Sequence, residues 1–224
     1  MTHTVHPYAH RIGTLRGWKS RWFAEGDQYQ EYFKADTLIR QYVNDKTRTH
    51  HVSSIEMERS EGQLQVIIKT SRPGLVIGRD GQHAQKLRDG IAELIDDNDL
   101  DEPDNIAIDV REVRSPESDA SILAQMVRSG LERRFPYRRT LKQTMDKAIA
   151  NRDVEGVRIA ISGRLGGAEM SREEEVKEGP IPLQTFRADV DFAREMARLP
   201  YGAIGVKVWV YRGDVFAEED KMTT

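Results

Sequence analysis

A glycine-bracketed loop between an apolar run and a helical pattern constrains the fold of this chain more than any other stretch. The loop is Gly78-Arg79-Asp80-Gly81, and it follows Leu75-Val76-Ile77. Because glycine has no Cβ, the main chain at Gly78 and Gly81 can adopt a positive φ and lie close to a ligand. The residues after the loop show helical spacing, with apolar side chains at Ala84, Leu87, Ile91 and Leu94. A helix that begins here directs its free N–H groups toward the loop, where a phosphate is favoured.

The segments around the loop predict a small α+β domain. Two alternating runs, Val52–Met57 and Leu64–Ile68, are joined by the polar connection Ser60-Glu61-Gly62 and predict an antiparallel hairpin. A helix that starts near Asp27 is predicted before the hairpin, and a strand over Ile106–Val110 is predicted after the loop helix. The resulting order, helix, strand, strand, helix, glycine loop, helix, strand, resembles the type II K-homology (KH) domain.

The KH resemblance gives the glycine loop a role, because the Gly-x-x-Gly loop of these domains holds single-stranded nucleic acid. The residues that it places at such a contact are Gly78, Arg79, Gly81 and Lys86. The alternative is an ordinary helical corner that needs glycine only for its turn. On the loop alone we would favour the corner, but the order of elements around it favours nucleic acid.

Composition excludes several classes of protein. Charged residues make up 32% of the 224 residues, and no apolar run approaches the length of a membrane span. The first ten residues are polar and predict no signal peptide. The chain has no cysteine, which fits a cytoplasmic location. The histidines at its start, His3, His6 and His10, have no cysteine or carboxylate at ligand spacing, so we expect no metal and no cofactor.

The net charge of −3 hides a local excess of positive charge. Residues 128–164 contain 10 basic and 4 acidic side chains. Five of the basic residues form what we call the basic ridge: Arg133, Arg134, Arg138, Arg139 and Lys142. A solvated helix face would usually interleave acids for ion pairing, whereas no acid occurs between Glu132 and Asp146. The ridge therefore predicts an external counter-charge, for which phosphate is the strongest candidate.

The second half of the chain predicts another α+β domain. Ser115-Pro116-Glu117 can begin a helix, and Pro136 separates this helix from the next. Later segments read as extended: Gly156–Ser162, Val176–Pro182, Thr185–Phe192 and Ile204–Tyr211. We expect two helices packed on an antiparallel sheet. The predicted boundaries are an N-terminal extension at 1–26, the KH domain (α-β-β-α-α-β) at 27–114, the second domain at 115–216 and a tail at 217–224.

Basic and aromatic residues are mixed along the N-terminal extension without forming an amphipathic element. Such a segment can bind a partner surface by base stacking and phosphate contact. Its candidate RNA contacts are Arg11, Lys19 and Arg21, to which we add Arg164 from the glycine-rich turn 163–169. The alternative is a tail whose tryptophans fold back onto the domain, and the sequence does not decide between the two.

Several strings, spread from the first residues to beyond Trp209, are more specific than a fold pattern. They are His6-Pro7, Arg11-Ile12-Gly13, Trp22-Phe23, Arg40-Gln41-Tyr42, Arg72-Pro73-Gly74-Leu75-Val76-Ile77-Gly78, Leu131-Glu132-Arg133-Arg134, Ser162-Gly163-Arg164-Leu165-Gly166-Gly167-Ala168-Glu169, Arg187-Ala188-Asp189 and Tyr201-Gly202-Ala203-Ile204-Gly205-Val206-Lys207-Val208-Trp209. In these strings the chain resembles the family of small-subunit ribosomal protein three, bacterial type.

The family resemblance implies a structural protein of the small-subunit head that binds ribosomal RNA and lines the channel by which messenger RNA enters. It also implies that basic side chains help to unwind structured message, and the pattern Arg-Arg-x-x-Lys puts this role on Arg138, Arg139 and Lys142. The implied partners are small-subunit rRNA, mRNA and the neighbouring ribosomal proteins ten and fourteen.

The chain departs from the family pattern in its acidic residues. Glu173-Glu174-Glu175 stands where the family tends to mix basic and aromatic residues, and Asp80 stands where the loop often has lysine. An acid beside a phosphate is repulsive, which counts against clamping by the loop but leaves the fold expectation unchanged. The near-neutral charge also fits an alternative, a stand-alone KH-type RNA-binding regulator or chaperone. An enzyme is not expected, because the sequence has no phosphate-binding loop, metal dyad or paired helical carboxylates.

Overall fold

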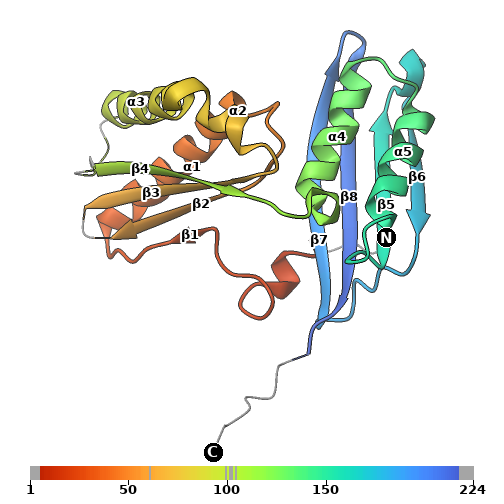
Figure 1. The fold of residues 1–224 in the computed structure, drawn as a ribbon, viewed down its shortest axis with the longest axis horizontal. Helices are drawn as coiled ribbons and strands as arrows, with labels where there is room; N and C mark the ends of the chain where they lie inside the picture. Colours follow the sequence, from red (N-terminus) through yellow and green to blue (C-terminus); the bar gives the residue numbers. More distant parts are fainter. Residues whose placement is uncertain (1–5, 61, 99, 101–102, 104, 217–224) are drawn as a thin grey trace, which may run out of the picture. The chain divides into compact units, whose positions relative to one another are not determined.

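The structure, a computed structural model, describes residues 6–60, 62–98, 100, 103 and 105–216 (Figure 1). The chain divides into two compact units. One unit is Trp18–Pro116, and the other joins the residues up to Gly17 with those from Glu117 onward. The predicted tail at 217–224 lies outside the described residues. Among the helices that the structure describes, none is long and apolar enough to cross a membrane.

The unit Trp18–Pro116 is a four-stranded sheet with helices against it. In chain order its elements are β1 (Ser20–Arg21), α1 (Asp27–Lys46), β2 (Val52–Ser60), β3 (Gln63–Thr70), α2 (Pro73–Ile77), α3 (Gln82–Asp97) and β4 (Asn105–Glu112). The strand order is β1-β2-β3-β4; β2 and β3 are antiparallel, and the other neighbours are parallel. From α1 to β4 the order is α-β-β-α-α-β, so the predicted KH-type fold is confirmed.

Alternation along the strands of this unit produces its core. One face of β2 and β3 is at most 4% exposed, at Ile55, Met57, Leu64, Val66 and Ile68. The helices α1 and α3 add Ile39, Val43, Leu87, Ile91 and Ile95 to the same core. Val76 of α2 is also fully buried, and it lies two residues before the glycine loop. The core therefore holds α2 and α3, the two helices that flank the glycine loop.

In its described residues the second unit contains two α-helices and four strands. They are α4 (Ala120–Glu132), α5 (Tyr137–Ile149), β5 (Gly156–Gly163), β6 (Arg172–Glu178), β7 (Ala188–Leu199) and β8 (Gly202–Asp214). The strand order is β6-β5-β8-β7, and every neighbouring pair is antiparallel. Both helices lie on one face of the sheet (Figure 1). The prediction of two helices on an antiparallel sheet is confirmed.

Two strands of this unit differ in extent from the prediction. The sequence predicted extended segments at Val176–Pro182 and Thr185–Phe192, whereas the strands are Arg172–Glu178 and Ala188–Leu199. The glutamates of β6 pair with β5 at the edge of the sheet, where polar side chains are tolerated. Pro180 and Pro182 follow β6, and proline donates no ladder hydrogen bond. The strand therefore ends earlier than the hydropathy pattern indicated.

The N-terminal segment, predicted as one extension at 1–26, is divided between the units. From His6 to Gly17 it lies against the second unit: the His6 ring meets Phe192 edge-on at 4.7 Å, and Arg16 Nη2 is 2.6 Å from Asp189 Oδ1. Its later part belongs to the KH unit, where β1 pairs with β2. Trp22 also folds back, because its Nε1 donates to Asp36 Oδ2 at 2.8 Å.

Candidate nucleic-acid interface

The glycine loop depends on positive φ angles at three of its four positions. Gly78 has φ 76° and ψ −176°, Asp80 has φ 51° and ψ 27°, and Gly81 has φ 75° and ψ 6°. A Cβ on Gly78 would lie 2.8 Å from the Cβ of His83, whereas a Cβ on Gly81 would meet nothing within 4 Å. Gly78 is therefore required by both conformation and packing, and Gly81 by conformation alone.

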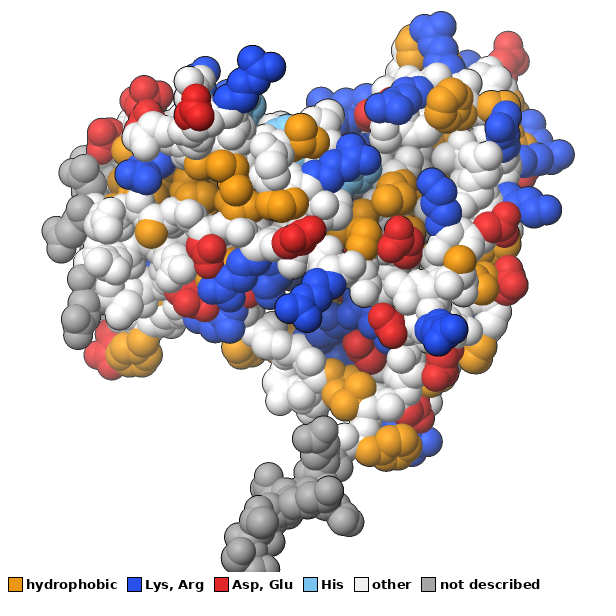
Figure 2. All heavy atoms as spheres, viewed as in Figure 1, with side chains coloured by type: hydrophobic (Ala, Val, Ile, Leu, Met, Phe, Trp, Pro, Cys, Tyr) orange, Lys and Arg blue, Asp and Glu red, His pale blue; other side chains and the backbone are white. Residues whose placement is uncertain are grey.

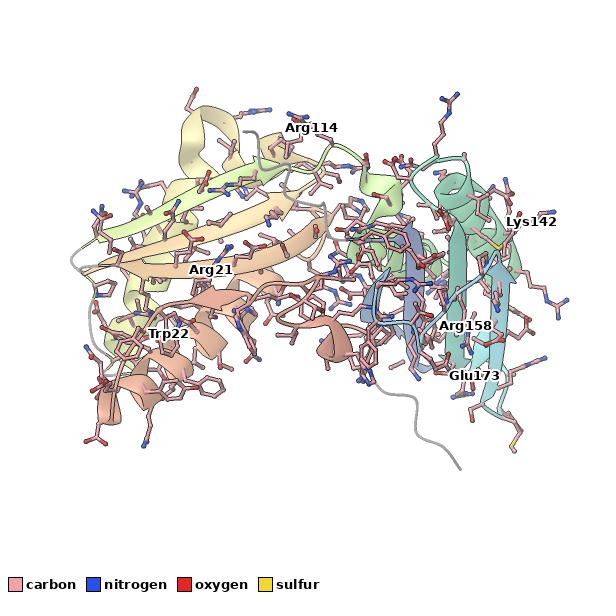
Figure 3. All side chains as sticks on the ribbon, turned by 90° about the horizontal axis from the view of Figure 1, so that it is seen from below. Arg21, Trp22, Arg114, Lys142, Arg158 and Glu173 are labelled. Carbon is pink, nitrogen blue, oxygen red and sulfur yellow. The ribbon has the colours of Figure 1, made fainter. Side chains whose placement is uncertain are left out.

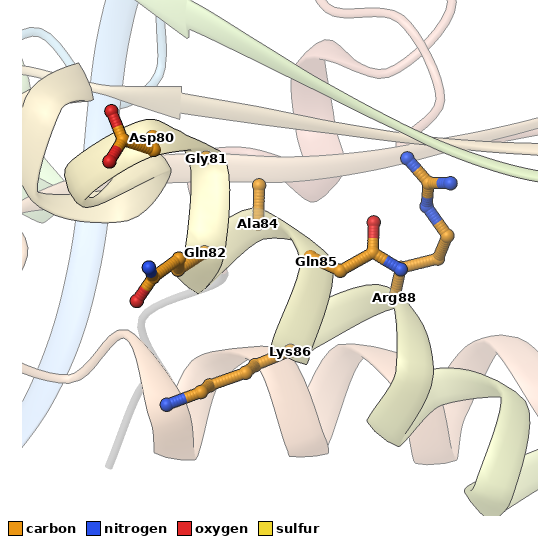
Figure 4. Close-up of a pocket in the computed structure, with 7 residues that line it drawn as sticks. All are labelled: Asp80, Gly81, Gln82, Ala84, Gln85, Lys86 and Arg88. Carbon is orange, nitrogen blue, oxygen red and sulfur yellow. The ribbon is translucent and has the colours of Figure 1, made fainter.

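A hollow of about 600 Å³ lies beside the loop and the first turns of α3 (Figure 4). Its lining residues are Asp80, Gly81, Gln82, Ala84, Gln85, Lys86 and Arg88. Figure 4 shows Lys86 and Arg88 extending to opposite sides of α3, with the Asp80 carboxylate at the loop. The predicted contacts Arg79 and Lys86 are exposed, as is Asp80. A phosphate near the loop would meet the N–H groups at the start of α3, but it would also meet a carboxylate.

The first turns of α5 present the basic ridge to solvent. The buried face of α5 consists of Thr140, Leu141, Thr144, Met145 and Ala148. Arg138, Arg139 and Lys142 lie on the other face and are exposed. Arg133 and Arg134 are also exposed, in the connection from α4 to α5. Figure 2 shows Lys and Arg side chains gathered over this part of the surface, and Figure 3 labels Lys142 where it points outward from α5.

One acid reaches the ridge from another element. Glu174 of β6 has its Oε1 3.4 Å from Nη2 of Arg138, and the same oxygen accepts a hydrogen bond from the Tyr137 hydroxyl at 2.9 Å. The bond from Tyr137 and then that from Arg138 lower the pKa of Glu174, while the bond to Glu174 raises the pKa of Arg138. The local sequence of α5 gave no sign of this acid, because β5 and β6 bring it there.

The other ridge cations differ from Arg138 in this respect. Within the described part of the chain, no carboxylate oxygen lies within 4.0 Å of the charged groups of Arg133, Arg134, Arg139 or Lys142. Asp146 is on the same exposed helix face, one turn after Lys142. The ridge therefore extends over the α4–α5 connection and the first two turns of α5, and it carries an excess of positive charge.

Arg11, predicted as an exposed RNA contact, is buried inside the protein. Its side chain is 0% exposed, and its guanidinium donates to the carbonyl oxygens of Pro7 at 2.9 Å, Ala188 at 2.6 Å and Thr185 at 2.9 Å. Burial lowers its pKa. This placement contradicts the prediction for Arg11, because the folded protein offers no guanidinium surface to RNA there. Arg11 instead attaches the N-terminal segment to the start of β7.

The remaining candidate RNA contacts differ in whether groups of the protein already bind their side chains. Arg164 is half-buried and donates to the carbonyls of Ala168 at 2.8 Å and Tyr201 at 2.9 Å, so it holds the glycine-rich turn. Arg21, labelled in Figure 3, is exposed but pairs with Glu56 at 2.5 Å and Glu58 at 3.1 Å. Lys19 is exposed beside it.

A Gly-x-x-Gly loop on a KH-type fold, with a cationic helix face on the following unit, defines the class of KH-containing RNA-binding proteins. Family comparisons agree with this class. The profile described as "KH domain" matches residues 38–118, and the profile described as "Ribosomal protein S3, C-terminal domain" matches residues 127–210.

Relatives extend the match over nearly the whole chain, and each of the following is named small ribosomal subunit protein uS3. The protein of Coprothermobacter proteolyticus is 40% identical over 96% of this chain and 89% of its own length. The protein of Caldicellulosiruptor bescii is 39% identical over 98% and 96%, and that of Maridesulfovibrio salexigens is 40% identical over 98% and 99%. The chain therefore belongs to the uS3 family of the bacterial type, whose members are structural components of ribosomes and not enzymes.

Proposed function

We propose that this chain is an rRNA-binding structural protein of the small-subunit head in the cytoplasm. In this proposal it helps to form the channel by which mRNA enters, and it holds or helps to unwind the incoming message. Family membership supports the ribosomal part. The observation that carries the mRNA part is the exposed basic ridge, most of whose cations have no carboxylate partner among the described residues.

The ridge can act on RNA without any chemical step. Arg138 and Lys142 are one helical turn apart, about 6 Å along the axis of α5, so one strand can meet both. Guanidinium and ammonium groups fixed on a packed helix hold the phosphates of a single strand at little cost in ordering. Binding to the single strand lowers the free energy of the melted message relative to the duplex. Nucleotide hydrolysis by this chain is not required.

The KH unit has a different role in this proposal, which is attachment to rRNA. Its contacts are the backbone at Gly78 and Gly81 and the side chains of Arg79 and Lys86. Asp80 keeps phosphates away from one side of the loop, so contact is made mainly along α3, where Lys86 is exposed. Lys19 and Arg21 lie on β1 or beside it and add a further rRNA contact. Ribosomal proteins ten and fourteen are the proposed protein neighbours.

Co-sedimentation tests the ribosomal part of the proposal. A structural component stays on small subunits through a high-salt wash, because it is held by many contacts within the assembly. A stand-alone regulator or chaperone, the alternative function, leaves with the wash because its binding rests on salt-dependent phosphate contacts. Loss of the protein from washed subunits would overturn the structural assignment.

Translation of paired messages tests the unwinding role. Ribosomes that carry Arg138→Ala, Arg139→Ala and Lys142→Ala together are expected to slow on a message with a stable hairpin and to translate its unstructured counterpart at nearly the normal rate. A matched control replaces three exposed cations outside the ridge, Lys34, Arg152 and Lys177, by Ala. Equal slowing on both messages would exclude unwinding by the ridge.

A further inference from the structure

The face of the second unit's sheet away from α4 and α5 is covered over only part of its area. Ile181, Leu183 and Phe192 pack there on Trp209 and Tyr211. The His6 ring lies against Phe192, so the N-terminal segment adds to the same cover. Farther along the strands the cover ends. Five residues of β5, β7 and β8 form this uncovered area, which we call the open sheet area: Ser162, Arg194, Met196, Gly205 and Lys207.

Two cations face each other in the open sheet area. Arg194 of β7 and Lys207 of β8 are direct cross-strand partners in the antiparallel register, and both are exposed. The Cβ atoms of such partners are about 5 Å apart, and like charges directly opposite destabilise a sheet. Among the described residues, no carboxylate oxygen lies within 4.0 Å of either charged group. The fold therefore maintains a repulsive pair that an anion would relieve.

The surface is hollowed beside this pair. A hollow of about 320 Å³ lies among the open sheet residues, and Glu195 and Val206 also line it. Gly205 lies between Ser162 and Met196 across the strands, and its missing side chain makes the hollow: a Cβ there would be 3.3 Å from the Ser162 Oγ. The hollow thus combines two cations, a hydroxyl that can donate, and a close approach to backbone.

The nearby acids leave the pair cationic. Glu175 is two strands from Lys207, with Ala160 between them, and it is engaged by Arg158 at 2.5 Å. Figure 3 labels Arg158 and Glu173 on these strands. Glu173 is the cross-strand partner of Ser162. The acid among the residues that line the hollow is Glu195. Glu195 pairs with Arg128 of α4 at 2.7 Å, so its charge is directed to the helix-covered face.

We propose that the open sheet area is a second RNA contact of this chain, in which Arg194, Lys207 and the Ser162 hydroxyl hold the phosphodiester backbone of rRNA. This inference rests on the proposed ribosomal function and deepens it. The basic ridge lies over the helices, on the other side of the same sheet. The second unit then binds RNA on both faces, message on the helix face and rRNA on the sheet face.

The salt dependence of rRNA binding measures the number of phosphates held. For the full-length chain with Arg194→Ala and Lys207→Ala, we expect binding to small-subunit rRNA to be about tenfold weaker at 0.1 M salt, and the log–log salt slope to be shallower by about 1.5. Lys177→Ala and Arg152→Ala, two exposed cations of the same unit, provide the matched control. The single variant Arg194→Lys, in which Lys207 is unchanged, keeps both positive charges and is expected to retain most of the wild-type slope. Equal slopes for wild type and the double variant would overturn the inference.

A photo-crosslinker identifies what covers the hollow. Met196 is 56% exposed in the open sheet area and is replaced by benzoylphenylalanine in chains that are then reconstituted into small subunits. The expected product is a crosslink to rRNA. A crosslink to a protein, as an acidic peptide docked on the cations would give, overturns the inference, as does no crosslink in assembled subunits. If the chain does not assemble or bind rRNA even as wild type, the proposed function itself fails, so the two failures are distinguishable.

Discussion

Arg138 and Glu174 lie 3.4 Å apart, from Nη2 to Oε1, although one belongs to α5 and the other to the edge strand β6. The Tyr137 hydroxyl holds the same carboxylate oxygen at 2.9 Å. The Arg138 side chain is 75% exposed, and an ion pair as exposed as this adds little to stability. The main consequence of Glu174 is therefore electrostatic: it removes one positive charge from the basic ridge at its first turn.

Replacing Glu174 by Gln is expected to tighten binding of single-stranded RNA. Glutamine keeps an acceptor for the Tyr137 hydroxyl and loses the charge, so we expect about threefold tighter binding at 0.1 M salt and a log–log salt slope steeper by about 0.7. Filter binding of an unstructured oligonucleotide to the full chain measures both. Glu178→Gln, at an exposed acid farther along β6, is the control. Unchanged affinity for Glu174→Gln would show that the ridge does not bind the strand.

Replacing Asp80 by Asn tests whether RNA phosphates approach the glycine loop. Asp80 has φ 51° and ψ 27°, a left-handed conformation that asparagine also tolerates, so the loop should keep its shape. Removing the charge is expected to strengthen RNA binding about threefold at low salt if phosphates approach the loop. Asp45→Asn, on the exposed side of α1, is the control. Identical binding by both variants would remove the loop from the RNA contacts.

The sequence predicted the order of elements and the basic ridge because both depend on local patterns. Apolar residues at every second position identified β3, and those at helical spacing identified α3 and α5, since a buried face requires such spacing. The glycine loop was recognisable because glycine adopts positive φ more readily than any other residue type. Arg138, Arg139 and Lys142 share a helix face, so their spacing alone brought them together.

What the sequence could not predict depends on contacts between distant residues. Glu174 reaches Arg138 across 36 positions, and Arg11 reaches the carbonyl of Ala188 across 177. Arg11 was predicted as an RNA contact because it lies in a basic, aromatic segment that forms no amphipathic element. In this fold backbone carbonyl oxygens, and not a phosphate, accept the hydrogen bonds of its guanidinium. The pair Arg194 and Lys207 went unnoticed for the same reason, since only the strand register places them opposite each other.

Replacing Gly78 by Ala should destabilise the KH unit, whereas the same change at Gly74 should not. Gly78 has φ 76°, and a Cβ there would be 2.8 Å from the Cβ of His83; a Cβ at Gly74 would meet nothing within 4 Å. We expect Gly78→Ala to lower the free energy of unfolding by about 2 kcal/mol, and Gly74→Ala to leave it nearly unchanged. Urea unfolding followed by circular dichroism compares the two. Equal stability would show that the loop relaxes without cost.

Replacing Arg11 by Met should weaken the second unit without weakening its RNA contacts directly. The carbonyl oxygens of Pro7, Thr185 and Ala188 would lose their donor in a buried place. We expect a loss of about 3 kcal/mol in the free energy of unfolding. The control is Lys177→Met, at an exposed position of the same unit. Urea unfolding and RNA affinity below the transition are both measured; reduced affinity at unchanged stability would restore Arg11 as an RNA contact.

Tyr211 should make the second unit sensitive to alkaline pH. Its side chain is 6% exposed, and its hydroxyl donates to Asp214 Oδ1 at 2.9 Å; burial, and then the bond to this carboxylate, raise the pKa of Tyr211 to about 12 from an ordinary value of 10.0. The folded state therefore holds the proton more tightly than the unfolded chain. Below pH 10 both states keep the proton and the stabilisation is complete, and it is lost as pH rises from about 10 through about 12.

The measurement is the urea midpoint at several pH values for wild type and Tyr211→Phe. Phenylalanine keeps the ring and cannot ionise, so the variant is expected to show a shallower fall in midpoint between about pH 10 and 12. The control is Tyr29→Phe, at an exposed tyrosine of the other unit. Parallel curves for wild type and Tyr211→Phe would mean that the Tyr211 proton is not held by Asp214, and that another group sets the alkaline limit of this unit.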